Sequence, residues 1–279
     1  MRILVTGAGG QLGTQLARRL ASVHQVAQRS HAQLDVADLT AVRNTLRRER
    51  PQVVLHAAAM TNVDRCEEEP EAAFRTNALG SRNVAATAQE LGALLVYLST
   101  DYVFSGEKGA PYTEFDPVDP VNAYGRSKLA GEEFVRELCP RHLIVRTAWL
   151  YSGRGKSDFV HTVRSLLEQG QPIRMVDDQR GSPTWVPDLT AALEQLLQRE
   201  AAGLYHLAGG GACSRFEFAR AIARLSGHDP EGIRPVPTSA FPRPARRPRD
   251  SSLDGLVLRL EGQSGLRPWP EALEECLTS

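Results

Sequence analysis

Closely spaced cysteines, long apolar runs and an excess of charge are all missing from this 279-residue sequence. Its four cysteines lie far apart, which excludes a compact zinc or redox motif and is typical of reduced thiols (Cys66, Cys139, Cys213 and Cys276). No run approaches the roughly 20 apolar residues that a membrane span needs. The apolar run Ile3–Val5 breaks at once into Thr6-Gly7, which is too soon for a signal peptide. We therefore expect a cytoplasmic protein without membrane contact.

Net charge is also missing, because 33 Lys and Arg residues balance 33 Asp and Glu residues. A neutral chain has no sequence-wide field to attract a polyanion, so nucleic acid is not an expected partner. Lysine itself is rare and occurs only three times, at Lys108, Lys128 and Lys156. This scarcity makes the surroundings of each lysine informative.

Short β-branched or apolar runs alternate with helical patterns such as Leu12-Leu16-Leu20. This alternation predicts an α/β fold, a doubly wound parallel sheet of the Rossmann type. We expect a dinucleotide-binding domain over residues 1–150 and mainly a smaller C-terminal substrate-binding lobe over 151–279, with a chain that can cross between them. The proline-rich stretch Pro235–Pro248 is expected to be an extended surface segment, neither strand nor helix. The predicted strands are Ile3–Val5, Gln25–Ala27, Val53–His56, Leu94–Leu98, Leu143–Val145 and Ile173–Val176.

A glycine-rich turn, Thr6–Gly13, directly follows the first predicted strand and opens the first predicted helix. Gly7 would permit the tight turn, Gly10 a close approach of backbone N–H groups to a pyrophosphate, and Gly13 close packing of helix and strand. A turn that only caps the strand, without a ligand, is the simpler alternative. The spacing Gly-x-x-Gly-x-x-Gly resembles that of the extended short-chain dehydrogenase/reductase superfamily.

The end of the second predicted strand bears on which dinucleotide is bound. NAD enzymes hold the ribose hydroxyls there with a carboxylate, but this chain has Gln28-Arg29-Ser30. Arg29 could pair with a 2′-phosphate, so NADPH is the predicted cofactor, with NADH as the alternative. An ordinary surface arginine is an equally simple interpretation of Arg29. Asp35 and Val36 resemble the pair that meets the adenine in the superfamily.

Tyr124 and Lys128 stand four residues apart at the start of a predicted helix, which places phenol and ammonium on one face. Because a free tyrosine has a pKa near 10, Lys128 is predicted to lower the pKa of Tyr124. Thr100 stands at the carboxyl end of a predicted strand, where open α/β sheets carry their sites. It would hydrogen-bond the carbonyl being reduced, while Tyr124 gives the proton and the cofactor the hydride. Taken singly, these residues also fit a strand end and a half-buried aromatic.

Over nearly its whole length the chain resembles the bacterial dTDP-4-dehydrorhamnose reductases. Most matching stretches are shared with other sugar-nucleotide enzymes, but Ser99–Phe104 (Ser-Thr-Asp-Tyr-Val-Phe) is more specific. The resemblance implies an NAD(P)H-dependent oxidoreductase that reduces the 4-keto group of dTDP-4-dehydro-6-deoxy-L-mannose, the last step of dTDP-L-rhamnose biosynthesis for polysaccharides. The stretches are Thr6–Gly13, His56–Asp64, Ser99–Phe104, Asn122–Glu132, Arg146–Tyr151 and Gly203–Leu207.

The resemblance also implies roles for individual residues. Thr100, Asp101 and Trp149 would contact the sugar nucleotide, and Lys128 would hold the nicotinamide ribose. Arg247, or its neighbour Arg246, would meet the diphosphate with a planar fork. Taken alone, Trp149 also fits a core aromatic, and the two arginines also fit solvated loop charges. Residues expected to line the cofactor are Gly10, Gln11 and Leu12 at the pyrophosphate, and Ala59, Met60 and Thr61.

Some members of the family hold a divalent metal with carboxylates between subunits. Here Gln15 stands where one carboxylate is expected and Asp188 stands near another, so no metal is predicted. The expected partner is a nucleotide-sugar substrate, and a homodimer stays open beside a monomer. Two other functions also stay open: a non-catalytic regulatory subunit like that of methionine adenosyltransferase, and a reductase or epimerase of another nucleotide sugar.

Overall fold

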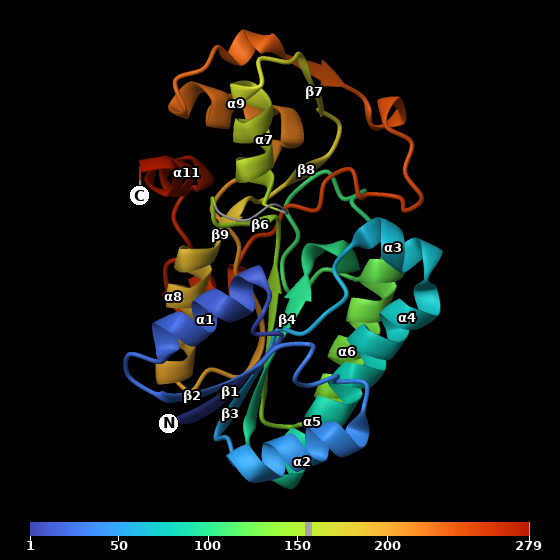
Figure 1. Ribbon diagram of the computed structural model, residues 1–279, viewed down its shortest axis with the longest axis vertical. Helices are drawn as coiled ribbons and strands as arrows, with labels where there is room; N and C mark the ends of the chain where they lie inside the picture. The colour runs from blue at the N-terminus through green and yellow to red at the C-terminus, as the bar shows by residue number, and fades with distance from the viewer. Residues whose placement is uncertain (154–157, 279) are drawn as a thin grey trace.

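The computed structural model describes residues 1–153 and 158–278, and a parallel sheet forms the centre of its larger lobe (Figure 1). In the described ranges this sheet has six strands in the order β10-β5-β4-β3-β1-β2, all pairs parallel. Helices cover both faces, so the strands read as nearly continuous apolar runs, as in the fully buried Val53–His56. The strands are β1 (Arg2–Thr6), β2 (Gln25–Arg29), β3 (Val53–His56), β4 (Leu94–Thr100), β5 (His142–Thr147) and β10 (Gly203–His206).

Two groups of helices enclose this sheet (Figure 1). One face packs on α1 (Gln11–Leu20) and α8 (Val186–Gln198), whose leucines share one core with β1, β3 and β5. The other face packs on α2 (Leu39–Glu49), α5 (Gly80–Glu90) and α6 (Ala123–Leu138) through a second core. The chain runs from β3 to α5 through α3 (Val63–Glu68), α4 (Pro70–Phe74) and the π-helical turn η1 (Arg75–Leu79). The short helix η2 (Asp101–Val103) follows β4, and α10 (Leu256–Leu260) packs beside β10.

A smaller lobe lies beyond one end of the sheet and contains α7, α9 and β7 (Figure 1). Its core is aromatic: the rings of Phe159 and Phe218 stack with centroids 5.5 Å apart, and Trp269 meets Phe218 edge-on. Paired short strands complete it: β7 with β12, β8 with β11, and β6 with β9. The bounds are β6 (Leu150–Tyr151), α7 (Phe159–Glu168), β7 (Ile173–Val176), β8 (Arg180–Gly181), β9 (Thr184–Trp185), β11 (Cys213–Ser214), α9 (Arg215–Leu225), η3 (Pro230–Gly232), β12 (Ile233–Val236), η4 (Thr238–Ala240) and α11 (Trp269–Thr278).

The predicted α/β class and parallel sheet are confirmed, and five of the predicted strands lie in the main sheet. Ile173–Val176 is a strand but belongs to the small lobe, while β10 (Gly203–His206) takes the sixth place. The chain therefore returns to the large lobe after residue 150, through α8 and β10. The expectation for Pro235–Pro248, neither strand nor helix, was wrong over its first part, because Pro235 lies in β12 and Thr238–Ala240 forms the short helix η4. A two-stranded ribbon has only edge strands, and an edge tolerates a residue without an N–H.

No helix in the two described ranges is both long and apolar enough to cross a membrane. Cys66, Cys139 and Cys213 are buried free thiols. Burial raises the pKa of Cys66 to about 11, so this thiol stays protonated at neutral pH.

Candidate functional site

The site is a cleft of about 840 Å³ at the carboxyl ends of the central strands. Its lining includes Gly7, Gly10, Thr100 and Tyr124. The structure therefore brings the glycine turn together with two of the predicted catalytic residues, Thr100 and Tyr124. The strand order reverses between β1 and β3, and Thr6 and His56 at the ends of these strands are paired in register. Ligands of open α/β sheets bind where the strand order reverses.

The glycine turn has the shape that its spacing predicts. Gly7 adopts a left-handed φ of 68°, and a Cβ there would lie 2.6 Å from the Ala57 carbonyl carbon. A Cβ on Gly13 would lie 2.3 Å from the Gly7 carbonyl oxygen, so α1 could not approach the turn. The start of α1, whose first N–H groups have no acceptor within the helix, lines the cleft through Gln11 and Leu12. The Gln11 amide also donates to Asp158, at 2.7 Å, and so ties the turn to the small lobe.

The structure does not bring Arg29 to the cleft. Its guanidinium forms an ion pair with Glu49 in a separate hollow, because the side chain leaves β2 on the side of α2. Ser30 and His31 line the cleft in its place. Val36 also lines it, whereas the Asp35 carboxylate accepts from the Ala37 N–H at 3.0 Å and faces Arg75.

Ala59 and Thr61 line the cleft, and Met60 between them points into a small core beside Tyr124. The backbone of Met60 is fixed by Asn77 of η1, which accepts from the Met60 N–H at 2.8 Å and donates to its carbonyl at 3.1 Å. Asn77 is fully buried, and its amide also reaches Ser127 of α6, at 2.9 Å. A buried amide at this point holds the cleft wall against the helix that carries Tyr124.

Tyr124 stands in the first turn of α6, which begins at the Asn122 cap. The helix can start here because residue 125 is glycine: a Cβ there would lie 2.1 Å from the Tyr102 carbonyl oxygen. Burial raises the pKa of Tyr124 above its ordinary value, and a hydrogen bond with the Thr100 side chain offsets this only in part. The expectation that Lys128 lowers this pKa is therefore corrected, since desolvation outweighs every other effect. A neutral phenol is the form that can donate a proton.

Lys128 lies one layer behind the cleft. Its ammonium donates to the Leu98 carbonyl oxygen at 2.7 Å and lies 4.0 Å from the centroid of the Tyr97 ring. Burial lowers the pKa of Lys128 to about 7, although the Glu132 carboxylate acts in the opposite direction. Glu132 itself stays ionised because buried Arg146 binds it at 2.7 Å.

Thr100 belongs to a buried chain of hydroxyl and carboxyl groups. It donates to one oxygen of Asp101 at 3.0 Å, and Ser251 donates to the other oxygen at 2.5 Å. Burial raises the pKa of Asp101 to about 6, against the effect of these two hydrogen bonds. The chain runs from Ser251 through Asp101 to Thr100, which lines the cleft together with Tyr124. The predicted substrate-contacting pair Thr100-Asp101 thus sits beside the predicted proton donor.

A second hollow, of about 1020 Å³, opens beside the cleft and is rich in arginine. Trp149, which the sequence predicts as a substrate contact, lines both spaces, and Arg247 lines the second. Arg215 also lines both, with its guanidinium 3.5 Å from the centroid of a ring of Trp149. Sequence reasoning missed Arg215, because only its position directly after the Ser214 cap distinguishes it from other arginines.

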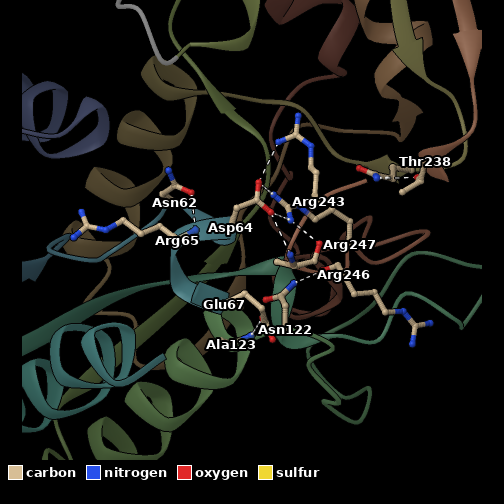
Figure 2. Close-up of polar contacts among 12 residues, drawn as sticks. Asn62, Asp64, Arg65, Glu67, Asn122, Ala123, Thr238, Arg243, Arg246 and Arg247 are labelled. Carbon is tan, nitrogen blue, oxygen red and sulfur yellow. Dashed lines mark hydrogen bonds and ion pairs between the residues drawn. The ribbon is translucent and has the colours of Figure 1, made fainter. Parts of the chain in front are cut away.

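The Asp64 carboxylate binds two arginines of the segment 242–249, Arg243 and Arg247 (Figure 2). Arg247 binds it with both terminal nitrogens, at 2.6 and 2.9 Å, and Arg243 adds a contact at 3.2 Å. These hydrogen bonds, Arg247 first, hold the pKa of Asp64 below its ordinary value. Asn122 donates to the Arg246 carbonyl oxygen at 2.8 Å, while the Arg246 side chain turns outward to Glu107. The segment is thereby bound to α3 and to the start of α6.

In the described part of the chain, no group of three or more His, Cys, Asp or Glu residues is placed to hold a metal ion. Asp188, which stands near one expected carboxylate position, forms two hydrogen bonds with Arg267 at 2.8 and 3.1 Å.

A glycine turn at the strand-order reversal, with a phenol and a threonine hydroxyl in the same cleft, defines a dinucleotide-dependent oxidoreductase of the doubly wound α/β class. Residues 1–279 match the family model described as "RmlD substrate binding domain". The chain belongs to this family.

Relatives extend over the whole chain. A dTDP-4-dehydrorhamnose reductase of Mycolicibacterium smegmatis is 42% identical, over 100% of this chain and 85% of its own length. The spore coat polysaccharide biosynthesis protein SpsK of Bacillus subtilis is 40% identical, over 99% of this chain and 96% of its own length. The crystal structure of dTDP-4-dehydrorhamnose reductase from Bacillus anthracis in complex with NADP has a TM-score of 0.96 at 40% identity and covers 99% of this chain and 98% of its own.

Proposed function

We propose that this chain reduces the 4-keto group of dTDP-4-dehydro-6-deoxy-L-mannose (dTDP-4-dehydrorhamnose) with NADPH and forms dTDP-L-rhamnose, the last step of dTDP-L-rhamnose biosynthesis. The carrying observation is the phenol of Tyr124, which lines one cleft together with the glycine turn and Thr100. Several relatives near 40% identity are named for this reaction, and one related structure holds NADP.

The glycine turn fits a dinucleotide, because backbone fills the space that side chains at Gly7 and Gly13 would take. NADPH, when bound, supplies the hydride that the carbonyl carbon accepts. Tyr124 supplies the proton to the carbonyl oxygen from its neutral phenol, so hydride and proton together convert the ketone into an alcohol. Thr100 places a hydroxyl beside that phenol, and Lys128 provides positive charge behind it.

A second sugar is also a candidate substrate. A relative from Streptomyces niveus, 38% identical over 98% of this chain, is named dTDP-4-keto-6-deoxy-D-glucose reductase. Both candidate substrates are 4-keto-6-deoxy sugars carried on dTDP. They differ only in the stereochemistry of the sugar. The non-catalytic regulatory subunit is disfavoured, because Thr100, Tyr124 and Lys128 are all present and the relatives are named as enzymes. A homodimer and a cytoplasmic location stay predictions.

The test is an assay of NADPH oxidation with each of the two dTDP-4-keto sugars. Wild-type protein should turn over the dehydrorhamnose at least about tenfold more efficiently than the keto-glucose, in kcat/KM. Tyr124→Phe should lose about a hundredfold or more in kcat and still bind NADPH, because only the proton donor is removed. Leu138→Ile at the distant end of α6 is a matched control. Normal turnover by Tyr124→Phe, or no turnover of either sugar by wild type, would contradict the proposal.

A further inference from the structure

Arg215 occupies the junction between the cleft and the second hollow, and it lines both. Its guanidinium lies 3.5 Å from a Trp149 ring centroid and 5.0 Å from that of Phe159. Arg215 is the first residue of α9, where the helix dipole disfavours a cation. The helix thus gains nothing from this charge, and the side chain extends from it toward the cleft.

The in-plane donors of Arg215 are available to a ligand. Within residues 1–153 and 158–278 its guanidinium has neither a hydrogen bond nor an ion pair, only the two ring contacts. Stacking uses the face of a guanidinium and leaves the N–H groups at its edge free. By contrast, Arg247 and Arg243 are bound to Asp64, and Arg246 is bound to Glu107.

The Trp149 indole that stacks on Arg215 is fixed by the local backbone and by its neighbours. Trp149 adopts a left-handed φ of 45°, a strained conformation for a residue other than glycine. Its ring fits over β8 because residue 181 is glycine: a Cβ there would lie 2.3 Å from an indole carbon. The backbone of Arg215 is fixed as well, since its N–H donates to the Gln179 carbonyl oxygen at 3.3 Å. Ring and cation are therefore positioned independently, the ring by the residue before β6 and the cation by the first residue of α9.

We propose that Arg215, stacked on Trp149, is a further substrate-binding residue that contacts the diphosphate of the nucleotide sugar. The inference rests on the proposed function, which places the sugar at Thr100 and Tyr124 in the cleft and leaves the nucleotide for the second hollow. A diphosphate that joins the two must pass the junction, where the free edge of Arg215 can donate two parallel hydrogen bonds to phosphate oxygens. Asp64 holds Arg247 at the wall of the hollow, whereas Arg215 stands at the junction of the hollow and the cleft without an acidic partner.

The experiment compares Arg215→Met, which removes the charge at similar length, with Arg215→Lys, which keeps charge without the planar fork. Calorimetry on NADP-loaded protein measures binding of dTDP and of thymidine. Arg215→Met should weaken dTDP binding about tenfold or more and leave thymidine binding within about twofold, with Arg215→Lys between wild type and Met. Arg224→Met, an exposed arginine on the same helix, is the matched control and should bind dTDP like wild type.

Gly181→Ala is a second, independent perturbation, because it displaces the Trp149 indole and leaves Arg215 in the chain. It should also weaken dTDP more than thymidine. Binding of dTDP by Arg215→Met within about twofold of wild type would overturn the inference even with turnover intact. Wild-type protein that turns over neither keto sugar would instead count against the proposed function, because the dTDP measurement does not depend on turnover.

Discussion

The Asp64 carboxylate binds both terminal nitrogens of Arg247, at 2.6 and 2.9 Å, across 183 residues of sequence (Figure 2). Asp64 belongs to α3 of the large lobe, and Arg247 to the segment that returns from the small lobe. The same carboxylate accepts from the Ala245 N–H at 3.3 Å. One acidic side chain thus attaches the wall of the second hollow to the dinucleotide-binding part of the molecule.

Replacing Asp64 with Asn should destabilise the fold by about 1–3 kcal/mol, because a neutral amide cannot accept from both nitrogens of Arg247. Urea unfolding at pH 7 measures this. The pKa of Asp64 is lowered in the folded state, so its stabilisation is present above the unfolded pKa and is lost as pH falls. The variant and wild type should therefore converge in acid. Glu69→Gln, which breaks an exposed pair with Arg65 near the same helix, should change stability less.

Ser30→Asp should lower the ratio of kcat/KM for NADPH to that for NADH by about tenfold or more. Ser30 lines the cleft at the end of β2, and a carboxylate there would repel a 2′-phosphate. Arg29→Met should leave the ratio within about threefold, because Arg29 faces Glu49 in another hollow. Steady-state assays with both cofactors decide this, and a large effect of Arg29→Met would restore the role that the sequence suggested.

The kcat/KM for NADPH should fall as pH rises through about 7. Burial lowers the pKa of Lys128 to about 7, so below that pH the side chain is an ammonium and above it a neutral amine. Only the ammonium adds positive charge to the hydrogen bonds expected at the ribose. The pKa of Tyr124 is raised, so the phenol should add no second step below pH 9. A flat profile from pH 6 to 9 would show that Lys128 keeps one charge state throughout.

Asp101→Asn should gain stability relative to wild type as pH rises from about 4 to about 7. Burial raises the pKa of Asp101 from 3.8 to about 6, so the folded state favours the protonated acid. The stability from this group is complete below the unfolded pKa and is lost as pH rises through about 6, roughly 3 kcal/mol in all. Thermal unfolding of both proteins across this range tests it. A constant difference in Tm would contradict a neutral Asp101.

The features of the fold and site that could be predicted from the sequence are those that depend on local chain geometry. The strand, the glycine turn and the helix over Arg2–Leu20 depend on φ angles and side-chain periodicity among near neighbours. The four-residue spacing of Tyr124 and Lys128 depends on the pitch of one helix. Both features are found in the structure at the predicted positions.

By itself, then, the sequence determined the parallel α/β class, the glycine turn and the helix position of the Tyr124 phenol. Tertiary structure decided where the long cationic side chains go: Arg29 to Glu49, Arg247 to Asp64 and Arg215 to Trp149. It also decided that the pKa of Tyr124 rises, because desolvation depends on everything that packs around the ring. The physical reason is range: backbone sterics act over a few residues, whereas these contacts join residues between 20 and 183 positions apart in the sequence.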